Sequence, residues 1–286
     1  IIKNVKSVVV PHTGGLRGIE AAAVAGIVAG DAAKELEVIS HVEQEDIEAM
    51  GNFLKEVPCS VCEASSDLIF DIQITLYHGE DEANVRITDF HTNLVHVSRN
   101  GEILLAKEIT GKEESALADK STLTIENIFA FAKEVDLADV REVLERQVRY
   151  NMAIAEEGLC GNYGANIGKV LLATYGDQDV KVRAKAMAAA GSDARMNGCV
   201  LPVMINSGSG NQGMTASIPV IEFAKELQVS HDKMLRALVL SNLVTIHLKT
   251  GIGTLSAYCG AVSAGCGSGA GIAYLYGGDY EVIAHT

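Results

Sequence analysis

Residues that could bind a small anion are concentrated between Gly191 and Val220. Asp193 and Arg195 come first in this segment, directly after a predicted helix. A guanidinium presents a fork of N–H donors that fits a carboxylate, so Arg195 is a candidate for binding an acidic group. A structural ion pair between Asp193 and Arg195 is the alternative interpretation.

The run NSGSGNQG, Asn206 to Gly213, follows and precedes a helix predicted over 214–227. Glycines let backbone N–H groups converge and a helix N-terminus adds positive potential, so such a run can hold an anion. It has no Lys and no G-K-[ST] sequence, which excludes a Walker loop. A carboxylate fits as well as a phosphate, and the flanking helices argue against a linker. Further polar side chains come from Ser207, Ser209, Asn211 and Gln212.

A second polar cluster is formed by His91, Thr92, Asn93 and His96. On a strand, His91 and Asn93 would face one side and His96 the other. Two histidines do not make a metal site. One interpretation is that these are surface or hydrogen-bonded polar residues; the other is that they contribute polar groups to an active site between two domains.

Six cysteines offer thiols for metal binding or chemistry. Cys59 and Cys62 have C-x-x-C spacing without a second pair, which favours coincidence over a zinc site. Cys259 and Cys266 are seven residues apart, so on a helix they would share a face. Such a pair could bind metal, but an iron–sulfur cluster needs three or four ligands, and two buried cysteines in a tightly packed helix are the default.

The secondary structure that is predicted to position these groups differs between the two halves of the sequence. Residues 1–10 predict a strand, and 19–38 and 43–57 predict helices. From residue 66 an alternating pattern predicts four strands, within 67–77, 83–90, 92–100 and 102–110, and hence a small, mostly antiparallel sheet. We therefore expect an α+β domain over residues 1–115.

The second half reads as helical throughout, and we expect an all-α domain over residues 120–286. Thr124 and Asp136 are predicted N-caps. Residues 250–278 contain no charged side chain, but they are rich in Gly, Ala and Ser, which favours a buried central helix over a membrane span. The remaining predicted helices lie within 166–174, 178–190, 214–227 and 231–249.

The amino-acid composition disfavours some classes of binding partner. The 286 residues carry a net charge of −14 without a basic cluster, which disfavours nucleic acid and anionic membranes. Six cysteines without a signal peptide favour the reducing cytoplasm over a disulfide framework. The many Ala- and Gly-rich helices are compatible with a homodimer.

Four segments together resemble the L-cysteine desulfidase family, which is related to the alpha chain of iron–sulfur L-serine dehydratases. They are VPHTGGLRG, HTNLVH, SDARMNGC with LPVMINSGSGNQG, and LSAYCGAVSAGCGSGAG. The resemblance covers nearly the whole chain in order. It implies a lyase that uses a [4Fe-4S] cluster and no pyridoxal phosphate. Such a lyase eliminates sulfide or water from a small amino acid, giving an aminoacrylate and then pyruvate and ammonia.

Residue by residue, the resemblance implies that Cys259 is the first cluster ligand, whereas Cys199 and Cys266 match no ligand. The family's other ligands and its early catalytic cysteine match no segment of this sequence, so we expect an incomplete member that is inactive alone, with its catalytic residue unidentified. L-cysteine is the expected substrate, with L-serine dehydration or a catalytically silent amino-acid-binding or assembly module as alternatives. The residues expected at the substrate are Ser192, Asp193, Arg195, Asn206, Ser207, Gly208, Ser209, Gly210, Asn211, Gln212, His91 and Asn93.

Overall fold

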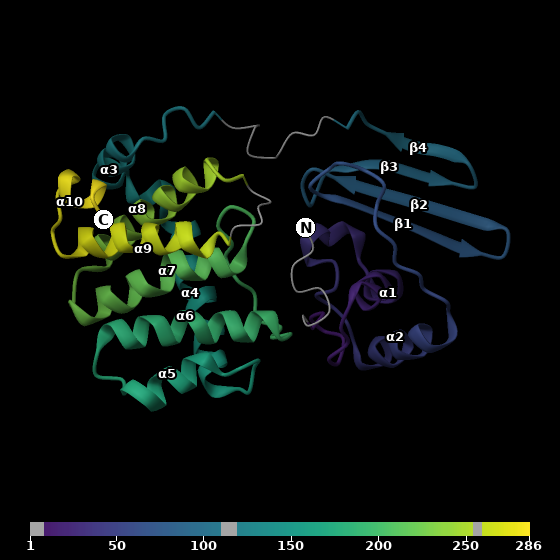
Figure 1. The fold of residues 1–286 in the computed structure, drawn as a ribbon, viewed down its shortest axis with the longest axis horizontal. Helices are drawn as coiled ribbons and strands as arrows, with labels where there is room; N and C mark the ends of the chain where they lie inside the picture. Colours follow the sequence, from purple (N-terminus) through teal and green to yellow (C-terminus); the bar gives the residue numbers. More distant parts are fainter. Residues whose placement is uncertain (1–8, 110–118, 254–258) are drawn as a thin grey trace. The chain divides into compact units, whose positions relative to one another are not determined.

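A computed structural model describes residues 9–109, 119–253 and 259–286 (Figure 1). The chain divides into two compact units, Ile1–Ala118 and Asp119–Thr286, and each is described by itself. The strand predicted over 1–10 lies mostly outside the described residues. Within them, Val9 forms an isolated antiparallel bridge with Arg17.

The first unit contains the predicted antiparallel sheet. Its strands are β1 (Asp71–His78), β2 (Asp81–Thr88), β3 (Leu94–Arg99) and β4 (Glu102–Ala106), paired in the order β1-β2-β3-β4. Asn100 and Gly101 connect β3 to β4, and both have positive φ, 50° and 82°. A two-residue turn of this kind matches the right-handed twist of the strands, which explains the Asn-Gly sequence.

The helical part of the first unit is α1 (Ile19–Ala29), a short 3₁₀ helix (Ala32–Glu37) and α2 (Gln44–Glu56). The single helix predicted over 19–38 is wrong, because α1 ends before Gly30. A side chain at Gly30 would overlap the carbonyl of Gly26, and the Asp31 carboxylate caps the next turn by accepting from Ala33 N–H. A small core buries Val24, Ala25 and Met50.

The second unit is helical, as predicted. It consists of α3 (Ile125–Glu134), α4 (Leu137–Cys160), α5 (Ile167–Tyr175), α6 (Val180–Met196), α7 (Gly210–Glu226), α8 (His231–Thr250), α9 (Ala261–Leu275) and α10 (Tyr280–Ala284). Thr124 and Asp136 cap α3 and α4 through their side chains, which confirms the two predicted caps. Helix α7 contacts α4, α6, α8 and α9 and supplies many of the buried side chains of the core.

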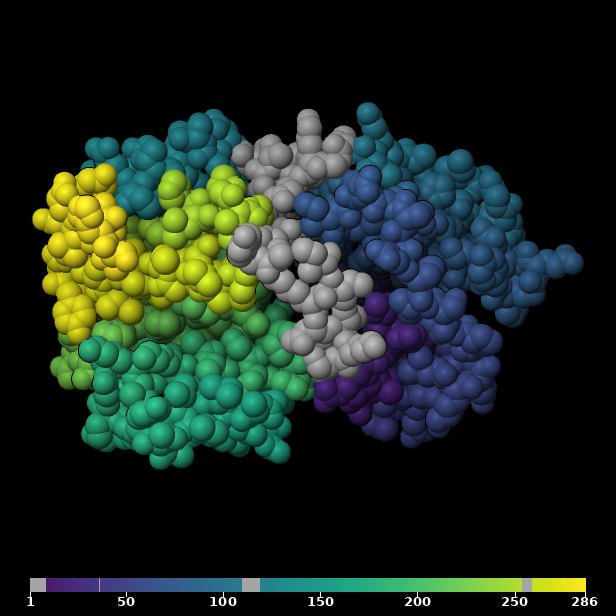
Figure 2. All heavy atoms as spheres, viewed as in Figure 1, coloured from purple at the N-terminus to yellow at the C-terminus, as the bar shows by residue number. Residues whose placement is uncertain are grey.

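The predicted small-residue helix is α9, which packs on α7 and α8 (Figure 1). Glycines allow the close approach: a side chain at Gly271 would lie 2.9 Å from the carbonyl oxygen of Ala237. The opposite face is open, with Val262 74% exposed, and α9 and α10 form part of the surface of this unit (Figure 2). No helix in the described ranges is long and apolar enough to cross a membrane.

Helix α9 starts at Ala261, later than the predicted residue 250, and residues 254–258 of that prediction lie outside the described part. Cys259 therefore precedes the helix. The expectation that Cys259 and Cys266 share a helical face is wrong for this reason.

Candidate functional site

The Ser-Gly run forms a tight turn that leads directly into α7. Asn206 and Ser209 exchange two backbone hydrogen bonds, both of 3.1 Å. Between them, Ser207 and Gly208 have positive φ values of 47° and 81°, as in a two-residue hairpin turn. The Ser209 hydroxyl caps the helix by accepting from Gln212 N–H at 3.4 Å. Helix α7 thus begins at Gly210, four residues before the predicted start, and the run is not a linker.

The first turn of α7 presents backbone donors. The N–H groups of Gly210 and Asn211 are the first of the helix and have no intrahelical acceptor. The helix dipole adds positive potential at this end, which favours an anion. Ser207, Gly208 and Asn211 remain partly or fully exposed, so this end of the helix is accessible.

Arg195 reaches the same end of α7 from the last turn of α6. Its Nη1 donates to Oδ1 of Asn211 at 3.2 Å. A side chain at Gly210 would overlap Nε of Arg195, so the guanidinium lies against the backbone of the helix start. Burial lowers the pKa of the guanidinium. No carboxylate of the described residues forms an ion pair with it, which leaves a partly desolvated cation without a counterion.

Ser192 and Asp193 have other positions than expected. Both lie within α6, not after a helix, because α6 extends to Met196. Oδ2 of Asp193 accepts from the backbone N–H of Ile167 at 2.8 Å and so fixes the start of α5. Asp193 therefore has a structural role, and it forms no ion pair with Arg195. Ser192 is half-buried.

A chain of buried amides supports the turn from behind. Nε2 of Gln212 donates to Oδ1 of Asn206 at 3.1 Å, and Nδ2 of Asn206 donates to Oδ1 of Asn242 at 2.9 Å. Asn242 and Gln147 then form a reciprocal amide pair, with distances of 2.8 and 3.0 Å. Gln147 and Asn242 were not expected at the site; each sits in a helical run whose sequence gives no sign of the pairing.

The amide oxygen at the end of this series has no hydrogen-bond partner among the described residues. Oε1 of Gln212 is buried and accepts no hydrogen bond from the described residues. A buried unpaired acceptor costs about 1–3 kcal/mol, so its presence at this position calls for an explanation. It faces Gly260, where a side chain would overlap it.

Asn151 of α4 holds the segment before the turn. Its Oδ1 accepts from Met204 N–H at 2.9 Å, and its Nδ2 donates to Oγ of Ser217 at 3.0 Å. Asn151 is fully buried. It thereby ties the chain at Met204 to α7, and it too was missed by sequence reasoning.

Cys259 lies at the same end of the helical unit as the turn. It is exposed and immediately precedes Gly260, which packs against Gln212. Cys266 is also exposed, whereas Cys199 is buried in the core, where it helps Glu157 and burial to raise the pKa of Tyr163. The part of the chain that the structure describes holds no group of three His, Cys, Asp or Glu side chains suited to a metal ion. One thiol does not fit a [4Fe-4S] cluster, which needs at least three ligands.

His91 and Asn93 belong to the first unit. They occupy the connection between β2 and β3, so the shared strand face considered for them does not exist, and the strand predicted over 92–100 begins only at Leu94. Nδ2 of Asn93 donates to the carbonyl of Thr88 at 3.1 Å, and the His91 ring lies 5.0 Å from that of Phe70. Both contacts hold the turn together, in agreement with the interpretation as locally bonded polar residues.

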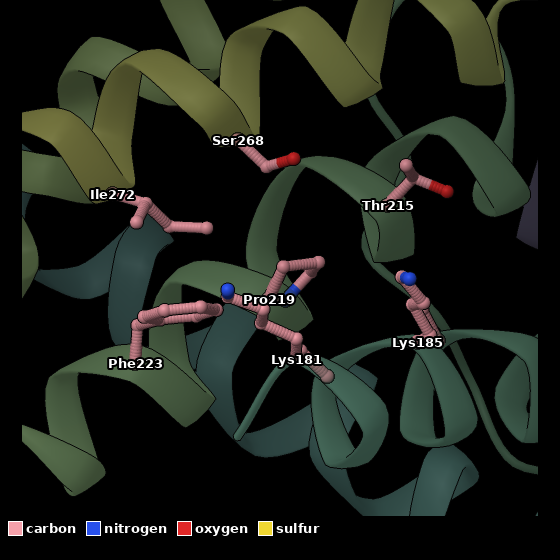
Figure 3. A pocket seen from close by; sticks show the side chains of 9 residues that line it. Lys181, Lys185, Thr215, Pro219, Phe223, Ser268 and Ile272 are labelled. Carbon is pink, nitrogen blue, oxygen red and sulfur yellow. The ribbon is translucent and has the colours of Figure 1, made fainter. Parts of the chain in front are cut away.

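A pocket of about 340 Å³ lies elsewhere in the helical unit, between α6, α7 and α9 (Figure 3). Its apolar lining includes Pro219, Phe223 and Ile272, and Lys181 and Lys185 of α6 line it as well. It includes none of the residues expected at the substrate. The candidate site is therefore the start of α7 with Arg195, and this pocket is separate from it.

Comparison with known proteins agrees with the predicted family. The family described as serine dehydratase alpha chain matches residues 33–286. A UPF0597 protein of Desulfitobacterium hafniense is 59% identical over 286 residues, which cover 100% of this chain and 66% of the relative. UPF0597 proteins of Lachnoclostridium phytofermentans and Fusobacterium nucleatum are 52% and 43% identical, covering 100% and 99% of this chain and 68% and 67% of those proteins.

The chain thus spans about two thirds of the length of the curated relatives that it matches. No solved structure matches it. The relatives' names state no substrate, whereas the family description names an alpha chain of serine dehydratase. On the extent of these matches, the chain belongs to the serine dehydratase alpha chain family.

Proposed function

We propose that the helical unit binds the carboxylate of a small α-amino acid, and that the chain serves a lyase that eliminates the β-substituent of this substrate. The observation that carries the proposal is Arg195, a partly buried guanidinium that has no carboxylate partner in the described structure and lies at the start of α7. A substrate carboxylate would supply the missing counterion.

The backbone supports the same ligand. The N–H groups of Gly210 and Asn211 offer donors beside the guanidinium, in the positive potential of the helix end. A carboxylate has two oxygens and can accept from both kinds of donor at once.

We propose L-cysteine as the substrate, with L-serine as the alternative. In either case a base removes the proton from Cα and the β-substituent leaves, as sulfide or as water. The aminoacrylate that remains takes up water and yields pyruvate and ammonia. The role of the helical unit in this scheme is to hold the carboxylate, so that Cα and Cβ have a fixed position.

Calorimetric titration tests the binding step. L-cysteine and L-serine should bind, and their methyl esters, which lack the carboxylate, should bind at least about tenfold more weakly. Arg195→Met should remove this difference. Equal affinity for acid and ester would refute the carboxylate site. Pyruvate formation with each amino acid then distinguishes a lyase from a binding module that performs no chemistry.

We further propose Cys259 as one ligand of an iron–sulfur cluster, in line with the family's relation to iron–sulfur dehydratases. The described residues do not complete the ligand set, so no step of the reaction is assigned to a cluster. After anaerobic reconstitution with iron and sulfide, Cys259→Ala should retain less iron per chain than the unmodified protein. Cys266→Ala is the matched control and should retain as much. Iron content that is independent of Cys259 would contradict the assignment.

A further inference from the structure

Hydrogen bonds fix the orientation of the buried side-chain amides behind the turn, that is, which atom of each is the oxygen and which is the nitrogen. Nδ2 of Asn242 donates to the carbonyl of Leu238 at 2.8 Å, and a carbonyl can only accept. The amide of Asn242 therefore cannot be reversed without placing two oxygens together. Its Oδ1 has to face Nδ2 of Asn206, which donates to the backbone carbonyl of Asn242 as well, at 3.3 Å.

The orientation of the Asn242 amide also determines the orientation of the Gln212 amide, through Asn206. With its Nδ2 committed to Asn242, Asn206 presents Oδ1 to the turn, where it accepts from Nε2 of Gln212 and from the Ser207 hydroxyl, at 3.1 and 3.0 Å. Nε2 of Gln212 is thereby used. The group that remains at the end of the chain of amides is Oε1, a pure acceptor, on a residue that is 1% exposed.

The unpaired acceptor belongs to the first turn of α7, the helix end of the proposed site. Gln212 is the third residue of α7, directly after Gly210 and Asn211, whose N–H groups have no intrahelical acceptor. Oδ1 of Asn211 is already occupied by Arg195, and Oδ1 of Asn206 by two donors. An α-amino acid carries an ammonium group one carbon away from its carboxylate, and beside a guanidinium and a helix N-terminus this cation needs an acceptor.

We infer that Oε1 of Gln212 accepts a hydrogen bond from the α-ammonium group of the substrate, and that Gln147 and Asn242 are positioning residues that keep this oxygen directed at the ligand. The inference rests on the proposed carboxylate site. The backbone of Gly260 lies against Oε1. The inference therefore includes a displacement of Gly260 from Gln212 when the ligand binds. The site then selects amino acids over acids that lack the amino group.

The test compares L-serine with 3-hydroxypropanoate, which keeps the carboxylate and the hydroxymethyl group but has no ammonium group. In titrations with the unmodified chain, L-serine should bind about 10- to 100-fold more tightly, the range of one charged hydrogen bond. Gln212→Met keeps the size of the side chain and removes the acceptor, so the two ligands should bind alike. Gln212→Glu keeps an acceptor and should keep the preference. Gln178→Met, the same change at an exposed glutamine, should alter nothing.

The ratio of the two affinities separates recognition from damage to the fold, because a structural loss weakens both ligands equally. Asn242→Asp places a second oxygen at the Leu238 carbonyl and should lower the ratio without touching the ligand. A ratio that Gln212→Met leaves unchanged overturns the ammonium assignment, and one that Asn242→Asp leaves unchanged overturns the positioning role. Equal binding of both ligands to the unmodified chain would refute only the ammonium assignment. A water molecule would then be the donor to Oε1 of Gln212. No binding of either refutes the carboxylate site itself.

Discussion

The guanidinium of Arg195 lies against the Cα of Gly210, with no space for a side chain between them. A Cβ atom at Gly210 would overlap Nε of Arg195 and would lie 2.7 Å from Cγ2 of Val203. The glycine at the first position of α7 is thus what lets a cation from α6 reach the helix N-terminus. Two sources of positive potential, the helix end and the guanidinium, lie together there because Gly210 has no side chain.

Gly210→Ala should therefore weaken ligand binding. The added methyl group forces the guanidinium away from the helix start, and we expect the affinity for L-serine to fall at least about tenfold in calorimetric titration. Gly265→Ala is the control: no atom lies within 4 Å of a Cβ at this helical position. It should leave binding unchanged and stabilise α9 by about 0.5–1 kcal/mol. Unchanged affinity in Gly210→Ala would mean that the guanidinium is not part of the site.

Replacing Arg195 by Met should weaken amino-acid binding to the level of the methyl esters, at little cost in stability. The guanidinium has a hydrogen bond to Asn211 but no ion pair to lose, and its burial without a counterion is itself unfavourable. We expect the free energy of unfolding, measured by urea denaturation, to change by less than about 1 kcal/mol. A loss of several kcal/mol would identify Arg195 as a structural residue.

Local patterns in the sequence predict much of the fold. The alternation in 67–110 and the Asn-Gly turn specify the antiparallel strands, and Thr124 and Asp136 mark helix starts, because each signal lies within a few neighbouring residues. The sequence pattern predicts the start of α7 four residues too late, since a glycine-rich run has low helix propensity. There the Ser209 cap and the packing of Gly213 against Met204 outweigh propensity.

The candidate site was only partly predictable for a related reason. Arg195 and the Ser-Gly turn carry recognisable chemistry, whereas Gln147 and Asn242 are 95 residues apart in sequence and meet only in the folded unit. Asp193 shows the reverse error: its charge suggested a partner for Arg195, but it caps α5 instead. Long-range partners of amides and carboxylates leave no periodic signal.

The first unit should lose stability in acid through Asp71. Arg86 donates to both carboxylate oxygens of Asp71, at 2.9 and 2.7 Å, and this hydrogen bonding holds the pKa of Asp71 below its ordinary value of 3.8. A carboxyl whose pKa is lower in the folded state stabilises the fold above the ordinary value, and this contribution is lost as the pH falls through the folded value.

Asp71→Asn should accordingly destabilise the first unit by about 1–3 kcal/mol at pH 7, because it leaves Arg86 without its carboxylate. The difference from the unmodified chain should shrink as the pH falls below the ordinary value of 3.8, and it should disappear at lower pH, where the carboxyl of folded Asp71 becomes protonated. Urea denaturation followed by circular dichroism over this pH range measures both. A difference that is independent of pH would show that the ion pair contributes nothing to folding.

Asn151→Leu should destabilise the helical unit, because it leaves buried polar groups without their partners. Asn151 accepts from the N–H of Met204 and donates to Ser217, and both bonds are lost. We expect the helical unit to lose at least about 2 kcal/mol in urea denaturation. Asn151→Asp keeps the acceptor for Met204 but loses the donor, so its loss should be intermediate. Asn162→Leu, at an exposed site, should cost less than about 1 kcal/mol. Equal effects at Asn151 and Asn162 would show that Met204 is not held through this side chain.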